Sequence, residues 1–209
     1  MKVKVRVLGF NHDILTNTAA YGTGTYATTA GISFEFIEFM IDDTKQMGST
    51  DTSEGGWPTT AMREFLEGDE GIGLISEACR TNIKQVEKQY IKISTDASSN
   101  NNYSSDRLWL LSCSEIWANG KRTDTPYGYA IAKEGEQYQF YKDKNPDGSS
   151  NTANEYLQKK ITSGQARIWW LRSRYSTSYG LFCIVGTTGD CARSPHTTAD
   201  FNVAPGFSI

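Results

Sequence analysis

The residues that could catalyse a reaction are few and scattered along this sequence. The chain has two histidines, His12 and His196, and only His12 has a neighbouring carboxylate, Asp13. A catalytic site needs a nucleophile, a base or a metal in mutual reach, and none of the short motifs of hydrolases, zinc proteases or nucleotide-binding loops occurs. Glu35 and Glu38 lie on opposite faces of a predicted strand, so they form no acid–base pair. We interpret His12 as a solvated surface residue and expect no enzymatic activity.

The cysteines show no pattern typical of redox or zinc chemistry. Cys79, Cys113, Cys183 and Cys191 form no CxxC pair. We interpret them as buried or incidental thiols. A disulfide between Cys183 and Cys191 is compatible with their spacing, but nothing else in the sequence favours it.

One segment resembles the opening of a calcium-binding loop. Asp143, Asn145, Asp147 and Gly148 follow the D-x-N-x-D-G pattern. The twelfth position is Asn154 in place of the glutamate that closes such loops, and no helix clearly flanks the segment. We interpret it as a turn-rich surface loop and expect neither a metal nor another cofactor, although calcium binding by residues 143–154 stays open.

Composition and charge exclude several kinds of partner. The net charge of −3 and the lack of a Lys/Arg-rich run argue against nucleic acid binding. No apolar run approaches the roughly 20 residues that cross a bilayer, so no membrane insertion is expected. Val3, Val5 and Val7 alternate with charged residues, which predicts a half-buried strand and not a signal peptide. We expect the protein to be made in a cytoplasm, where it stays or leaves within an assembly.

Hydrophobic patterning predicts short strands, short helices and long loops in one domain, residues 1–209. A strand at each end suggests that the two termini pair, and Ser114 is expected to cap a helical turn that ends at Trp117. The fold class is therefore α+β. Strands are expected at 3–9, 32–41, 108–111, 168–171, 181–185 and 203–209, helices at 59–67 and 74–80, loops at 11–31, 42–57 and 94–105, a loop-rich insertion at 119–165, and either helix or strand at 83–93.

The most informative feature is a set of residue types that is missing from the C-terminus. Residues 174–209 contain no Lys, Glu, Gln, Met or Trp, although typical composition includes all five. These five cannot be encoded when the first two bases of an AAC or AAT codon are randomised, whereas every type present can be. Residues 174–180 and 186–202 are also rich in Tyr, Ser and Gly, a composition typical of binding surfaces. We interpret residues 174–202 as a variable binding region.

Several short motifs carry a family resemblance from about residue 32 to the end. They are Trp169–Ser173 (WWLRS), Phe182 with Val185, and Val203–Phe207 (VAPGF), together with DRLWLLS at 106–112 and EGEQY at 134–138. These motifs resemble an uncharacterised bacterial and phage domain family. That family is similar to the C-type-lectin-like variable proteins of diversity-generating retroelements, which include a phage tropism determinant. The sequence departs from the family pattern at Arg174 and Asn202, which leaves the bounds of the variable region uncertain.

The resemblance implies a C-type-lectin-like fold that displays variable residues on an exposed surface for receptor binding. The implied partners are a bacterial surface receptor, protein or glycan, and other virion proteins, with homo-oligomers left open. The implied location is a phage tail or virion surface after assembly in a bacterial cytoplasm, with the bacterial cell surface as the alternative. The variable positions would be Tyr175, Ser176, Thr177, Ser178, Tyr179, Ile184, Gly186, Asp190, Cys191, Arg193, Ser194, His196, Thr197, Thr198, Asp200 and Phe201.

The remaining motif residues would form a constant framework beneath that surface. Trp169 and Trp170 are expected to anchor the core, and Arg172 to donate hydrogen bonds to loop carbonyls. The other framework positions would be Leu171, Ser173, Phe182, Val185, Gly189, Val203, Pro205 and Phe207.

Two alternatives share this fold. One is a tail or cell-surface adhesion protein without diversification. The other is an enzyme similar to formylglycine-generating enzymes, whose catalytic cysteine pair is not matched by the spacing of Cys183 and Cys191. The calcium-ligand motifs of true lectins are absent, so calcium-dependent sugar binding is not implied.

Overall fold

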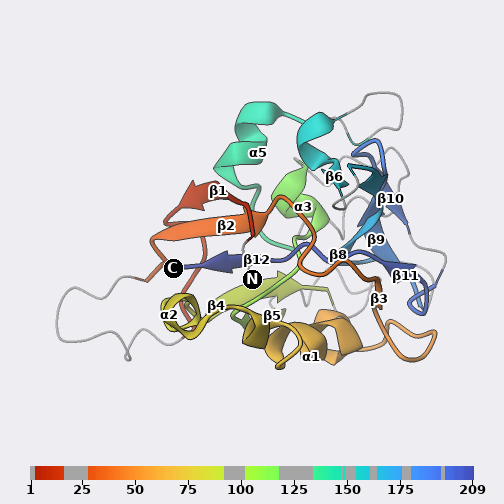
Figure 1. The fold of residues 1–209 in the computed structure, drawn as a ribbon, viewed down its shortest axis with the longest axis horizontal. Coiled ribbons are helices and arrows are strands. Elements are labelled where there is room, and N and C mark those ends of the chain that lie inside the picture. Colours follow the sequence, from red (N-terminus) through yellow and green to blue (C-terminus); the bar gives the residue numbers. More distant parts are fainter. Residues whose placement is uncertain are drawn as a thin grey trace.

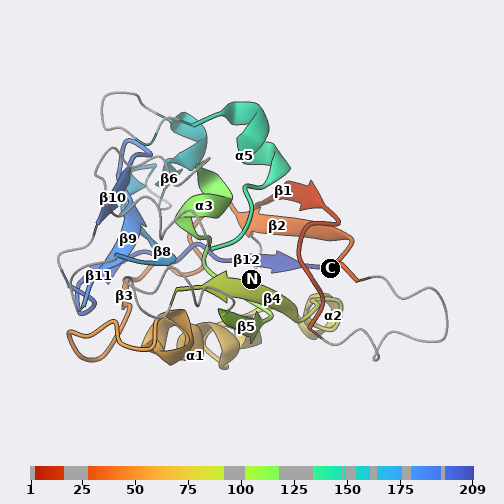
Figure 2. The same cartoon turned by 180° about the vertical axis from the view of Figure 1, so that it is seen from behind.

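Two three-stranded antiparallel sheets form the framework of the protein. Their strand orders are β1-β2-β12 and β10-β9-β8, and they lie toward opposite ends of the long axis in Figures 1 and 2. The computed structural model describes residues 3–16, 28–91, 102–117, 134–146, 148, 154–160, 164–175, 180–193 and 196–209. The strands of these sheets are β1 (Val5–Phe10), β2 (Ile32–Phe36), β12 (Gly206–Ser208), β8 (Trp169–Arg174), β9 (Phe182–Val185) and β10 (Cys191–Arg193).

Short strand pairs and helices surround these sheets, which gives the mixed α+β architecture that the sequence predicts. The pairs are β3 (Lys45–Gln46) with β11 (Asp200–Phe201), β4 (Val86–Tyr90) with β5 (Asn102–Asp106), and β6 (Lys159–Lys160) with β7 (Ala166–Arg167). The helices are α1 (Ala61–Glu67), α2 (Glu77–Arg80), α3 (Cys113–Ile116) and α5 (Gln139–Lys144), with 3-10 turns η2 (Trp57–Thr59), η3 (Ile72–Leu74) and η5 (Glu155–Leu157).

The helix α1 forms where the sequence predicts one. The Thr60 hydroxyl accepts a hydrogen bond from the backbone N–H of Arg63, which caps the first turn. Pro58 lies in the preceding 3-10 turn, where its missing N–H costs nothing. Met62 and Leu66 follow at i and i+4 and are buried, so one face of α1 packs on the core.

The terminal strands do not pair with each other, which corrects one expectation. β1 and β12 both pair with β2, which lies between them. The strand β2 also ends at Phe36, because the backbone N–H groups of Phe36 and Met40 bond to the carbonyls of Pro205 and Val203. The segment 37–41 therefore leaves the sheet and follows the C-terminal segment.

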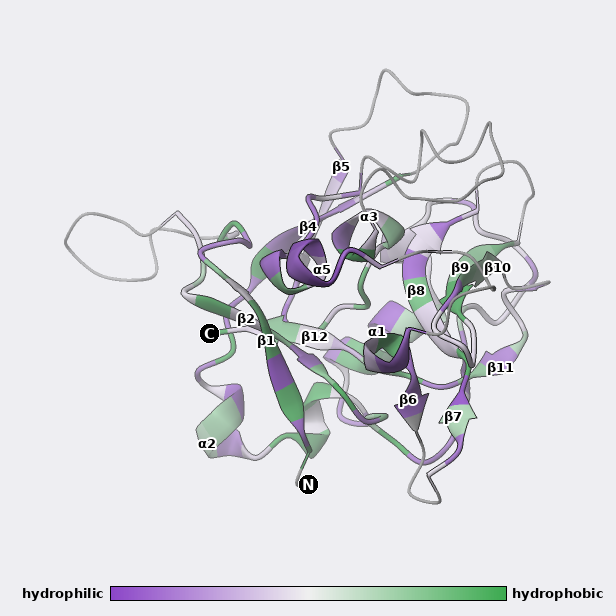
Figure 3. Cartoon of the chain, turned by 90° about the horizontal axis from the view of Figure 1, so that it is seen from above, coloured by the Kyte–Doolittle hydropathy of each residue, from purple (hydrophilic) through white to green (hydrophobic). Residues whose placement is uncertain are grey.

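The alternation along β1 predicts that its valines face the interior and its charged residues face solvent, but the structure shows the reverse for Val5, Arg6 and Val7. Val5 and Val7 are 38% and 39% exposed, whereas the Arg6 guanidinium points inward and bonds to Glu35 and to the Tyr156 carbonyl. In Figure 3 a hydrophilic band interrupts the hydrophobic colour of β1. The charge of Arg6 is buried because Glu35, distant in sequence, supplies an opposite charge.

The segment before α3 is buried but is not a regular strand. Residues 108–111 are fully buried, and only Trp109 forms a bridge, with Gly206. The residue that caps α3 is Ser112, not Ser114. Its hydroxyl accepts from the N–H of Glu115, and the Glu115 side chain accepts from the N–H of Ser112, which completes a capping box.

Two predicted loops contain regular structure. The strand β5 occupies residues 102–106, at the end of the predicted loop 94–105, and its pairing with β4 resolves 83–93 in favour of a strand. The predicted insertion at 119–165 contains α5, η5 and β6. In Figure 1, α5 lies beside β1, and residues 118–133 lie outside the described part of the chain.

The sheet β10-β9-β8 separates two hydrophobic clusters. Trp169 and Val185 belong to one cluster, and Trp170, Phe182 and Ile184 belong to the other. Successive residues of a strand point to opposite faces, so β8 and β9 are buried on both sides. All residues of these two strands are buried, so β8 and β9 lie in the interior between the two hydrophobic clusters.

Candidate functional site

The C-terminal segment contributes both interior and surface residues to the predicted binding region. Four of the predicted variable residues are buried: Tyr175 is 7% exposed, Ile184 5% and Thr197 0%, and Gly186 is also buried. Ile184 is buried because β9 has hydrophobic clusters on both faces. The expectation that these four residues are displayed to solvent is therefore wrong.

Six other predicted residues reach the surface. His196 and Asp200 are exposed, and the rest are half-buried. They extend from the turn after β9 to β11, so they follow one continuous stretch of chain. The six are Asp190, Cys191, His196, Thr198, Asp200 and Phe201.

The remaining predicted positions cannot be placed in the same way. Ser176, Thr177, Ser178, Tyr179 and Ser194 lie outside the described residues. The backbone of Arg193 belongs to β10, but its side chain is not described.

The predicted framework residues lie mostly in the interior. Pro205 is buried, and Phe207 is half-buried with its ring stacked on Phe34 at 5.1 Å between centroids. The framework side chains with no exposed area are Trp169, Trp170, Leu171, Arg172, Ser173, Phe182, Val185 and Val203.

The loop at residues 47–51 lies against the C-terminal segment and forms the other side of the candidate binding face. The sequence did not predict this contact. The Asp51 carboxylate lies 2.7 Å from His196 Nδ1 and accepts from the N–H of Thr197. Thr197 also donates its hydroxyl to the Thr50 carbonyl and accepts from the N–H groups of Met47 and Gly48. The hydrogen bond from His196 lowers the pKa of Asp51. Thr197 is therefore a buried anchor that holds the C-terminal segment against residues 47–51.

Ser53 accepts hydrogen bonds from residues on both sides of positions 176–179, which lie outside the described residues. Its hydroxyl oxygen lies 2.6 Å from Arg174 Nε and 3.1 Å from the backbone N of Gly180, and both groups donate to it. The N–H of Tyr175 also donates to the Leu181 carbonyl. These hydrogen bonds fix the positions of Arg174, Tyr175 and Gly180.

Two hollows border the contact between this loop and the C-terminal segment. One, of about 490 Å³, is lined by residues of 47–61 with Phe182 and Thr197. The other, of about 550 Å³, is lined by residues of 44–49 and α1 with Asp200. Both volumes fall within the range of small-molecule sites, so this face has concave as well as protruding parts.

Arg172 is the central polar residue beneath the face. Its guanidinium donates two hydrogen bonds to Glu115, at 2.5 and 2.9 Å, and three more to the carbonyls of Gln89, Leu110 and Glu134. All five N–H donors are therefore used, which confirms the prediction that Arg172 holds loop carbonyls. The paired charges lower the pKa of Glu115 and raise that of Arg172 against the effect of burial.

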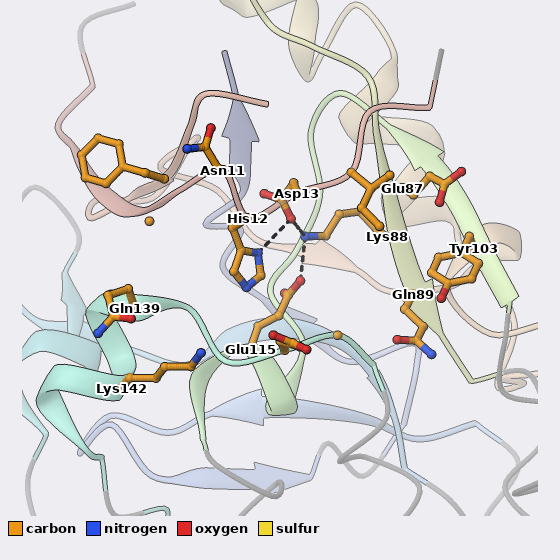
Figure 4. A pocket seen from close by; sticks show the side chains of 15 residues that line it. Asn11, His12, Asp13, Glu87, Lys88, Gln89, Tyr103, Glu115, Gln139 and Lys142 are labelled. Carbon is orange, nitrogen blue, oxygen red and sulfur yellow. Dashed lines mark hydrogen bonds and ion pairs between the residues drawn. The ribbon is translucent and has the colours of Figure 1, made fainter. Parts of the chain in front are cut away.

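A second candidate site, which the sequence did not predict, is a pocket between β1, β4, α3 and α5. Its volume is about 540 Å³, and Figure 4 shows the side chains that line it. Its floor is an ionic network in which the Lys88 ammonium lies 2.8 Å from Asp13 and 2.6 Å from Glu115. Lys88 also donates to the Tyr138 hydroxyl. The three groups fully occupy this ammonium, so it is structural and not a free nucleophile.

His12 forms part of this second site and is not the solvated residue that the sequence predicted. Its ring stacks on Tyr138 at 4.0 Å between centroids, and Nδ1 lies 3.4 Å from Asp13. Nε2 has no hydrogen-bond partner within the described residues, and Figure 4 shows it facing the pocket. The adjacency of His12 and Asp13 was the only sequence signal of this site.

Buried carboxylates in and around these sites are held by protein partners. Lys88 lowers the pKa of Asp13, and Lys159 and Arg6 lower that of Glu35, in each case against the effect of burial. Glu134 differs, since burial raises its pKa to about 8. These shifts report interior ion pairs and one buried acid.

No metal centre is evident in the described part of the chain. No group of three or more His, Cys, Asp or Glu side chains there could hold an ion. In the calcium-like segment, Asp143 accepts a hydrogen bond from Gln139 within α5, and Asn154 is buried and donates to the Gly189 carbonyl. Asp147 lies outside the described residues. Among the helices described, none has the length and apolar character needed to span a bilayer.

The fold and these two sites define an α+β domain with a buried aromatic and ionic framework and a partly exposed C-terminal face. The chain belongs to the DUF6273 family, a domain of unknown function, whose family model matches residues 29–209. No curated protein matches the chain, and no solved structure does.

Proposed function

We propose that the protein is a non-enzymatic ligand-binding protein of C-type-lectin-like fold, whose C-terminal face binds a bacterial surface receptor from a phage particle. The face consists of the exposed C-terminal residues together with the loop at 47–53. The proposal includes diversification of this face by a retroelement, because residues 174–209 lack the five residue types that adenine-directed mutation cannot produce.

The observation that carries the proposal is the restricted composition of residues 174–209 together with a framework whose hydrogen bonds do not involve the exposed C-terminal side chains. The contacts of Arg172 involve residues before the variable segment, namely Glu115 and three backbone carbonyls. Trp169 and Trp170 donate their indole N–H groups to the carbonyls of Leu157 and Lys45. These interactions do not involve the exposed C-terminal side chains, so changes at the exposed positions would leave them intact.

The burial pattern reduces the set of positions that can be diversified without loss of stability. Replacing a buried residue in a close-packed core costs several kcal/mol, so we assign Tyr175, Ile184, Gly186 and Thr197 to the framework. The diversified positions of the proposal are then the six surface residues named above and those of the original set that are not described. Histidine, aspartate and phenylalanine at these surface positions offer hydrogen-bonding and aromatic contacts to a partner.

Presentation in many copies on a virion fits this kind of face. A small concave and polar surface supports modest affinity per copy, and multivalent attachment raises the overall avidity. The bacterial cell surface is the alternative location, and a non-diversified adhesion protein is the alternative function.

The decisive experiment is sequencing of this gene and its surroundings in sibling phages or strains. We expect a reverse transcriptase gene and a template repeat nearby, with changes concentrated at the exposed positions of residues 174–202. The matched control is the same comparison for residues 134–173, which should be constant. Substitutions spread evenly over both segments, or an invariant C-terminus, would refute diversification and leave the alternative of a fixed adhesion surface.

A further inference from the structure

Cys113 meets two cysteines of the distant β9–β10 hairpin, Cys183 and Cys191, beneath the C-terminal face. Cys113 begins α3, Cys183 lies in β9 and Cys191 begins β10. Val185 pairs with Cys191 and lies two residues from Cys183, so both thiols project from the same face of the β9–β10 hairpin. The sulfur atoms of Cys113 and Cys191 are 3.8 Å apart.

The three thiols differ in their access to solvent. Cys113 and Cys183 have no exposed area, whereas Cys191 is half-buried. A dissolved oxidant therefore reaches Cys191 first. Burial and the neighbouring thiols raise the pKa of Cys113, so this thiol is assigned the second step, in which its proton passes to the leaving hydroxyl as its sulfur attacks.

We propose that Cys191 and Cys113 form an oxidation site that a hydroperoxide converts into an intramolecular disulfide. In the first step the Cys191 thiol reduces hydrogen peroxide, giving a sulfenic acid and one water. In the second step the Cys113 sulfur attacks the Cys191 sulfur, the S–S bond forms, and the hydroxyl leaves with the thiol proton as a second water. Two thiols are oxidised, and one peroxide is reduced to two waters.

The 3.8 Å separation of the Cys113 and Cys191 sulfurs supports this pair, whereas the disulfide that the sequence left open would join Cys183 and Cys191, which do not pair directly across the hairpin. A disulfide needs sulfurs about 2 Å apart, so the Cys113 and Cys191 sulfurs must approach each other by a little under 2 Å. Cys191 belongs to β10, an edge strand of its sheet that pairs with β9, and its backbone N–H donates to the Gly148 carbonyl. An edge strand can make this adjustment more easily than β9, which is buried on both faces.

The disulfide would join the edge of the C-terminal sheet to the helix that carries Glu115. Since Glu115 binds Arg172 and Lys88, the link would connect the outer strand of the face to the ionic framework. The inference concerns this chain as it stands and is tested without reference to the proposed function. Cys191 is also one of the positions proposed to be diversified, so a relative with another residue there would lack the link.

The experiment treats the full chain with hydrogen peroxide after reduction and removal of the reductant, in a Cys79→Ser background. This background removes the exposed thiol of α2, which would otherwise link two molecules. Remaining thiols are then blocked with N-ethylmaleimide. We expect an intact mass lower by two hydrogens, two fewer blocked thiols, and a linked peptide pair containing Cys113 and Cys191 in a non-reducing digest. We also expect a higher melting temperature, which returns to the reduced value after treatment with a phosphine.

Two further variants make the result decisive. Cys191→Ser should remove the link while the reduced protein keeps its melting temperature, because the residue is half-buried. Cys183→Ser should leave the Cys113–Cys191 link intact. A linked peptide pair containing Cys183, or over-oxidation of Cys191 with Cys113 still available to the maleimide after denaturation, would overturn the proposal. If Cys183→Ser does not fold, the peptide map of the background protein alone decides between the pairs.

Discussion

At the scale of single residues, Arg172 is the donor whose hydrogen bonds connect β8 to Glu115 and to three backbone carbonyls. It is completely buried and satisfies the Glu115 carboxylate and three carbonyl groups. Arg172→Ala removes two charge-assisted hydrogen bonds from the buried Glu115 carboxylate, which keeps only Lys88 and the Ser112 N–H, and three more from backbone carbonyls. We therefore expect a loss of about 3–5 kcal/mol in the free energy of unfolding. Urea denaturation followed by tryptophan fluorescence measures this loss.

Two variants control this measurement. Arg167→Ala removes an exposed arginine near the same strand and should change the stability by no more than about 0.5 kcal/mol. Arg172→Lys keeps the charge but not the planar group that forms two parallel bonds with Glu115, so its effect should lie between the other two. An Arg172→Ala protein as stable as Arg167→Ala would contradict the role given to Arg172.

Glu134 makes stability depend on pH in a defined direction. Burial raises its pKa from 4.5 to about 8, so between these values the folded protein binds more protons than the unfolded chain. The contribution of this group to the free energy of unfolding is full below pH 4.5 and falls as pH rises to about 8, by at most roughly 1.4 kcal/mol per pH unit. We expect a melting temperature that declines between pH 5 and pH 8.

The variant Glu134→Gln tests this origin of the pH dependence. The amide keeps an oxygen that can accept from the N–H of Ile91, the bond that Glu134 Oε1 accepts. We expect it to melt at a higher temperature than the natural protein at pH 8 and to show a flatter profile from pH 5 to pH 8. Parallel profiles for the two proteins would assign the pH dependence to other groups.

At the scale of elements, α3 offers a direct comparison between two serines. Ser112 caps the helix, whereas Ser114 bonds only to the Ser112 hydroxyl within the described contacts. Ser112→Ala should lower the free energy of unfolding by about 1 kcal/mol or more, and Ser114→Ala by clearly less, as measured by chemical denaturation. Equal losses would mean that the capping box does not stabilise α3.

The elements differ in how far the sequence could predict them. The helix α1 and the strands β8 and β9 follow from local patterns, namely a cap, helical spacing and apolar runs. Ser112 and Ser114 are both suitable caps locally, and only the return contact of Glu115 distinguishes them. The faces of β1 were predicted wrongly because the partner of Arg6 is Glu35 on another strand, and alternation alone carries no information about such distant partners.

At the scale of the whole molecule, the sequence predicted the class of fold and the interior position of the aromatic residues in β8. It predicted a loop at 42–57 but not that residues 47–53 contact the C-terminal segment, because the contacts with Thr197 and Arg174 link residues more than a hundred positions apart. It also did not predict the pocket of Figure 4, whose ionic floor joins Asp13, Lys88 and Glu115 from three separate regions. Polar networks of this kind are recognised only after the chain is folded, whereas apolar strands are visible in the sequence itself.

The last prediction concerns the tolerance of the C-terminal face as a whole. His196, Thr198 and Asp200 are exposed or half-buried, so a chain with all three changed to alanine should melt close to the natural protein. Ile184 is 5% exposed within a hydrophobic cluster, and Ile184→Ala should cost about 2–5 kcal/mol, or roughly 4 °C or more in melting temperature. Differential scanning calorimetry on the two variants compares them directly. If the triple variant were destabilised as much as Ile184→Ala, the exposed positions would be structural, and a face that accepts many side chains could not be the basis of the function.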